Sequence, residues 1–139
     1  MKYQSKINLP NDIQTVPQLE SFVEAAGEAA GLDASVTMSL NLALEEAVVN
    51  VMEYAYPEGM QGSVTIDATV GSGQLNFKLY DNGTPFDPTT QPEVDTTLTA
   101  EQRVEGGLGI HLMRRFMDSI DYEHADGHNI LTLKKNVEK

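Results

Sequence analysis

Two glycine-containing turns constrain the fold of this chain more than any other feature. Each turn lies between stretches in which apolar and polar residues alternate, as they do in half-buried strands. The two pairs of stretches are residues 62–70 with 75–80, and residues 120–124 with 129–133. The turns are Gly71-Ser-Gly73 and Asp126-Gly127, whose composition is typical of β-hairpins. The sequence therefore predicts two antiparallel strand pairs.

Apolar residues recur at helical spacing in two stretches before the first hairpin. In residues 15–30, Thr15 to Gln18 has the pattern of a capping box, and Gly31 is expected to end the helix. The second stretch begins after Asp33, a typical N-cap residue, and we expect this helix to run to about Glu53 or Tyr54.

The remaining segments complete the expected order of elements. Residues 2–9 alternate as a further strand, and an amphipathic helix is expected after Gly109. Residues 84–105 form a long, proline- and threonine-rich connection, which in a small domain is typical of a lid. Strands and helices do not alternate throughout, so a doubly wound parallel sheet is not expected. The prediction is an α+β two-layer sandwich, with a mixed, mostly antiparallel sheet and helices on one face.

Composition limits the classes of protein to which the chain could belong. Its 139 residues suit a single domain spanning residues 1–139. The absence of cysteine excludes disulfides and thiolate metal sites, and no apolar run has a membrane helix's length. The net charge of −12 argues against nucleic acid as a partner and suits a neutral or basic protein. We therefore expect a cytoplasmic protein that binds neither nucleic acid nor membrane.

Glu46 and Asn50 are the first candidate site residues. At about 100° per residue, they share one face of the second helix, whereas Glu45 points to another face. A carboxylate and a carboxamide at the edge of a buried face can supply oxygen ligands to Mg²⁺ or a general base. The alternative interpretation is a solvated acidic helix edge, which is common.

Asp81 and Gly83 form a second candidate cluster at the end of a strand. The carboxylate can accept a hydrogen bond from an amino group such as that of adenine, and the glycine permits close approach of a ligand. An ordinary Asn-Gly turn would explain the same residues.

The third candidate is the glycine-rich segment 105–110, which leads directly into a helix. Backbone N–H groups before a helix N-terminus can bind phosphate. The segment lacks the Gly-Lys-Ser/Thr of a Walker loop and the preceding strand of a dinucleotide-binding motif. A plain helix entry remains the alternative.

The order of these three clusters is more specific than any one of them. It resembles the ATPase fold shared by gyrase-type, chaperone, sensor-kinase and mismatch-repair ATP-binding domains, known as the GHKL superfamily or Bergerat fold. Within it, the chain is most similar to the bacterial anti-sigma factor serine/threonine kinases of partner-switching systems. The resemblance runs over nearly the whole chain and rests on Glu46-Ala-Val-Val-Asn50, Asp81-x-Gly83 with Pro85-Phe-Asp-Pro88, and Gly106-Gly-Leu-Gly-Ile110 with His111-Leu-Met.

The resemblance implies a role for each matching residue. Glu46 would be the catalytic base, and Asn50 would hold the Mg²⁺ that bridges the phosphates of ATP. Asp81 would recognise the adenine amino group, with Gly83 allowing the approach. Gly107 and Gly109 would admit the phosphates at the helix start, with Leu108 between them in the nucleotide-binding set, and Arg103 would neutralise the terminal phosphate. Thr132 would line the adenine pocket. Tyr54 stands where relatives often carry His.

The function implied by the resemblance is that of a Mg-ATP-dependent protein kinase. It would phosphorylate a Ser or Thr of a small anti-sigma antagonist, otherwise hold a sigma factor inactive, and form a homodimer. A non-catalytic, nucleotide-gated binding module is the alternative. A detached sensor-histidine-kinase domain ranks last, because residues 15–30 contain no phosphoacceptor His.

Overall fold

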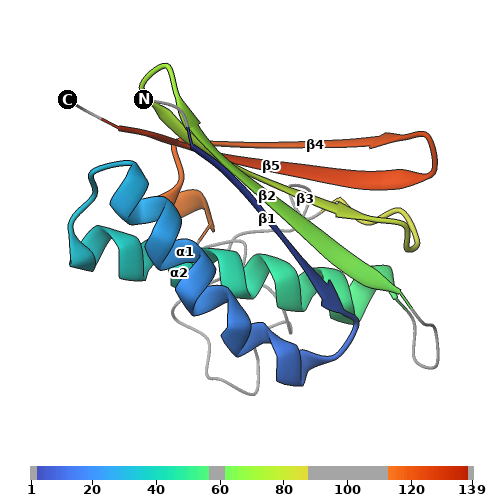
Figure 1. Cartoon of the computed structure of the whole chain (residues 1–139). Helices are drawn as coiled ribbons and strands as arrows, with labels where there is room; N and C mark the ends of the chain where they lie inside the picture. Colours follow the sequence, from blue (N-terminus) through green and yellow to red (C-terminus); the bar gives the residue numbers. More distant parts are fainter. Residues whose placement is uncertain (1–2, 57–61, 88–112, 138–139) are drawn as a thin grey trace, which may run out of the picture.

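A computed structural model describes residues 3–56, 62–87 and 113–137 of the chain. In these ranges, a five-stranded sheet carries the helices α1 and α2 on one face (Figure 1). Its strand order is β1-β2-β3-β5-β4, and every pairing is antiparallel among the described residues. The strands are β1 (Tyr3–Pro10), β2 (Ser63–Gly71), β3 (Gln74–Asp81), β4 (Ser119–Ala125) and β5 (His128–Asn136). The α+β sandwich is confirmed, and the expected mixed sheet is corrected to an antiparallel one in the described part.

Both predicted hairpins are present, and their turn residues explain the pairing. Ser72 and Gly73 have φ of 54° and 76°, and Asp126 and Gly127 have φ of 53° and 78°. Two consecutive residues with positive φ are the requirement of a type I′ turn, whose twist matches that of paired strands. These turns fix the register in which β2 pairs with β3 and β4 with β5.

The helical layer begins differently from the prediction and ends nearly as predicted. The expected capping box at Thr15 is wrong, because the chain enters through the 3₁₀ helix η1 (Ile13–Gln18), which begins earlier. The cap is Asp12, whose carboxylate accepts a 2.9 Å hydrogen bond from Gln14 N, while Thr15 Oγ1 donates to Asp12 O. Helix α1 (Leu19–Ala29) follows, and Gly31, with a φ of 75°, lies just beyond its end.

Helix α2 (Ala34–Asn50) starts at the predicted cap. Asp33 Oδ1 accepts a 2.9 Å hydrogen bond from Val36 N. The helix continues as one π-helical segment, η2 (Val51–Ala55), which sequence reasoning did not anticipate. Such segments insert an extra residue into a helical turn and are frequent at functional sites. None of the described helices combines the length and the apolar character needed to cross a bilayer.

The core lies between the sheet and the two helices. Alternate residues of β3 and β5 face the helices, and the buried ones include Phe77, Leu79, Leu131 and Leu133. The same alternation continues to the end of the sheet, where it carries Asp81 and Asn129 onto the buried face as direct cross-strand partners. Strand alternation thus places two polar side chains together at the edge of an apolar core.

Candidate functional site

Asp81 is the last residue of β3 and is 4 % exposed. Its Oδ1 accepts hydrogen bonds of 2.9 Å from Gly83 N and 2.9 Å from Asn129 Nδ2. Burial raises the pKa of this carboxyl, and the two hydrogen bonds partly offset that effect. Both of these neutral donors contact Oδ1, so Oδ2 is the oxygen placed to accept a hydrogen bond from a ligand.

Asn129 links the parts of the site, although sequence reasoning did not select it. Its Nδ2 also donates to Thr84 O at 2.9 Å, and its Oδ1 accepts from Phe86 N at 3.3 Å and from the Tyr122 hydroxyl. One buried amide therefore joins β3, β4, β5 and the segment after β3. The alternation of Leu131 and Leu133 was the available signal, because it places residue 129 on the same face.

Thr132, predicted to line the adenine pocket, requires a correction. It pairs with Lys78, and both residues belong to the alternating set whose neighbours in the strand are buried against the helices. Side chains three apart in a strand point to opposite faces, so Thr132 lies on the face opposite Asn129. The side chain that β5 contributes beside Asp81 is that of Asn129.

Gly83 brings the segment after β3 against the end of the long helix. A Cβ added at Gly83 would lie 2.3 Å from Ala55 O, and Thr84 N donates to that same carbonyl oxygen at 2.6 Å. Only glycine permits this approach. The contact matters because Ala55 ends η2, about one turn beyond Asn50, so Asp81 and Asn50 belong to two elements that meet here.

Glu46 and Asn50 lie one helical turn apart near the end of α2. Asn50 is 4 % exposed and Glu46 is partly buried. Glu45 belongs to a different face, as predicted: it lies near Asn41 and Glu20. Burial is the main cause that raises the pKa of Glu45, against a hydrogen bond from Asn41 and with a smaller contribution from Glu20. Glu45 and Glu46 thus point to different faces of α2, although the charge of Glu46 also contributes to the raised pKa of Glu45.

Two tyrosines near the end of the long helix also contact the segment after β3. The Tyr56 hydroxyl accepts a 3.1 Å hydrogen bond from Asn82 N and lies 2.7 Å from Ser63 O. The Tyr54 ring stacks on Phe86 with a centroid distance of 5.2 Å. Tyr54 thus packs against the segment after β3 through its aromatic ring.

Comparisons with known proteins agree with this geometry. A family model described as "Histidine kinase-like ATPase domain" matches residues 9–135. The chain belongs to this family. Its relatives include the serine/threonine-protein kinase BtrW of Bordetella bronchiseptica, 29% identical over 72% of this chain and 70% of that protein. They also include the serine-protein kinase RsbW of Listeria monocytogenes, 28% identical over 79% of this chain and 73% of that protein.

A solved structure of the RsbU and RsbW domains of Rv1364c from Mycobacterium tuberculosis has the same fold. It superposes with a TM-score of 0.68 over 99% of this chain at 16% identity, and the chain spans 33% of that larger protein. The fold and the family expected from the sequence are therefore confirmed. The names of the relatives confirm the expected enzyme class, a serine/threonine protein kinase, and the family makes ATP its nucleotide.

Four of the residues expected to contact the nucleotide fall outside the described ranges. Arg103, Gly107, Leu108 and Gly109 all lie in residues 88–112. Within residues 3–56, 62–87 and 113–137, no group of three or more acidic, His or Cys side chains could hold a metal ion by itself.

Proposed function

We propose that this chain transfers the terminal phosphate of Mg-ATP to a Ser or Thr of a small anti-sigma antagonist protein. The observation that carries the proposal is the buried Asp81–Asn129 pair, which abuts the end of the helix carrying Glu46 and Asn50. This arrangement supports a site in which one end recognises adenine and the other end carries out phosphate transfer.

Asp81 would select adenine. Its Oδ2 can accept a hydrogen bond from the adenine amino group. Guanine carries a carbonyl oxygen at the corresponding position, and two acceptors facing each other at a buried site are unfavourable. Because Asn129 and Gly83 fix the position of the carboxylate, we expect ATP to bind more tightly than GTP.

The catalytic end would need few protein groups. Mg²⁺ is usually held by one or two protein oxygens, with phosphates and water as its other ligands, and Asn50 suits that role. Glu46 would orient or deprotonate the attacking hydroxyl. Gly107, Leu108, Gly109 and Arg103 would contact the phosphates, as the sequence motifs suggest. Phosphoryl transfer depends mainly on positioning and charge stabilisation, so this set would suffice.

The partner assignment follows the relatives. We propose a single ATP-binding domain that forms a homodimer, acts in the cytoplasm, and binds a sigma factor when it does not phosphorylate the antagonist. A non-catalytic, nucleotide-gated binding module is the second candidate, because an acidic surface would serve sequestration equally well.

The proposal is tested by incubating the protein with a candidate antagonist, Mg²⁺ and ATP labelled in its terminal phosphate. We expect the label on a Ser or Thr, none with EDTA, and none when that residue of the antagonist is replaced by Ala. A stable complex in which the antagonist stays unmodified would contradict the kinase assignment and favour the binding module.

A further inference from the structure

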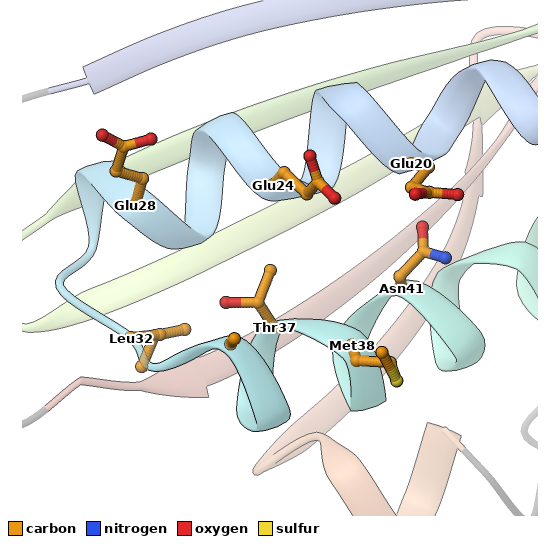
Figure 2. Close-up of a pocket in the computed structure, with 8 residues that line it drawn as sticks. Glu20, Glu24, Glu28, Leu32, Thr37, Met38 and Asn41 are labelled. Carbon is orange, nitrogen blue, oxygen red and sulfur yellow. The ribbon is translucent and has the colours of Figure 1, made fainter.

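A groove between the two helices has no part in the proposed nucleotide site. It has a volume of about 500 Å³ and lies between α1 and the N-terminal half of α2, whereas the nucleotide site adjoins the other end of that helix. Figure 2 shows the side chains that line it, with three glutamates along α1, Leu32 on the connecting turn, and polar and apolar residues along α2. The lining residues are Glu20, Glu24, Glu28, Leu32, Ala34, Thr37, Met38 and Asn41.

One wall of this α1–α2 groove is strongly acidic. Glu20, Glu24 and Glu28 follow each other at intervals of four residues, which places them along one face of α1. No Lys, Arg or His occurs anywhere between residues 7 and 77, so neither helix supplies a cation to neutralise them. Like charges four apart destabilise a helix, and a bound cationic partner would remove that repulsion.

The other wall combines polar side chains with an exposed apolar one. Met38 is 66 % exposed, and Leu42, which lies one turn further along α2 beside the groove, is 45 % exposed. Methionine adapts its shape to different apolar partners, which suits a docking surface.

We propose that the α1–α2 groove docks a basic amphipathic helix of a partner protein. Lys or Arg side chains of that helix would face the three glutamates, and its apolar stripe would cover Met38 and Leu42. The stripe from Glu20 to Glu28 is about 12 Å long, which matches two to three turns of a helix. The helices α1 and α2 of a second copy are poor occupants, because they carry no Lys, Arg or His that could face the acidic wall.

The probe is a fluorescent peptide of about 18 residues in which Leu and Lys form an amphipathic helix. A scrambled peptide of the same composition, and one with Glu in place of Lys, serve as controls. The E24K/E28K double variant reverses the acidic wall. Its matched control is D121K/E123K, which makes the same charge change at two exposed positions of the edge strand β4.

We expect the amphipathic peptide to bind the wild type and to lose about tenfold or more in affinity with E24K/E28K, but less than about threefold with D121K/E123K. M38Q should weaken binding about threefold or more at unchanged charge. Amide chemical shifts of the wild type should change along residues 20–42 when the peptide is added. Urea unfolding of each variant would show that the fold is intact, and it keeps this test separate from the kinase assignment.

Five results would each overturn the proposal. Equal losses in the two double variants, or equal binding of the scrambled peptide, would reduce the effect to general charge attraction. Shift changes confined to other residues, or no binding at about 1 mM peptide, would leave the groove without this ligand. Ultracentrifugation that finds a dimer dissociated by M38Q would make a second copy the occupant.

Discussion

Glu46→Gln is expected to lower the rate of phosphate transfer by about 10²–10⁴-fold, the usual contribution of a general base. The substitution keeps the size of the side chain and removes only its charge and its ability to take a proton. ATP affinity should stay within about twofold, because adenine recognition is assigned to Asp81 at the other end of the site. Single-turnover transfer and calorimetric ATP binding measure the two effects separately.

Glu45→Gln is the matched control for this variant. Glu45 is the adjacent carboxylate, but it lies near Asn41 and Glu20 on a different face of α2. Its neutralisation should therefore leave transfer unchanged. If both variants lost activity equally, the effect would come from the charge of the helix and not from a base at position 46.

Gly83→Ala is expected to lower the free energy of unfolding by about 1–3 kcal/mol and to weaken ATP binding strongly. The new methyl group would lie 2.3 Å from Ala55 O, a backbone atom that cannot rotate away. Relieving the clash must separate the segment after β3 from the end of η2, which would break the hydrogen bond from Thr84 N to Ala55 O. Urea unfolding gives the stability change, and calorimetry gives the affinity.

Gly31→Ala separates this steric effect from a general cost of replacing glycine. Gly31 has a φ of 75°, but a Cβ there would meet nothing within 4 Å. We expect it to cost about 1 kcal/mol through backbone strain and to leave ATP binding intact. Normal ATP binding by a stable Gly83→Ala protein would show that the contact with Ala55 does not organise the site.

Local patterns predicted much of the fold. The hairpin turns, the Asp33 cap and the end of α1 at Gly31 each depend on a few adjacent residues, and the structure confirms them. The start of the first helix could not be read in this way, because Asp12 and Thr15 are both good capping residues. The conformation of the chain after β1 decides which of the two residues caps the helix.

The candidate site was predictable where its motifs are local and not where it depends on strand pairing. Asp81 stands out as an acid at the end of a strand. Asn129, 48 residues later, becomes its partner only through the register of β3 and β5. The same register puts Thr132 on the opposite face. The π-helical segment before Tyr56 has no sequence signal that we recognise. Its last carbonyl oxygen nevertheless accepts a hydrogen bond from Thr84 N.

Calorimetric titration of the wild type and of Asp81→Asn with Mg-ATP and Mg-GTP tests the central claim most directly. An asparagine keeps the shape of the side chain and removes the charged acceptor, so we expect ATP affinity to fall about tenfold to hundredfold. The wild type should prefer ATP over GTP, and the variant should lose that preference. Unchanged ATP affinity in a well-folded Asp81→Asn protein, or no ATP binding by the wild type, would contradict a nucleotide site built around Asp81.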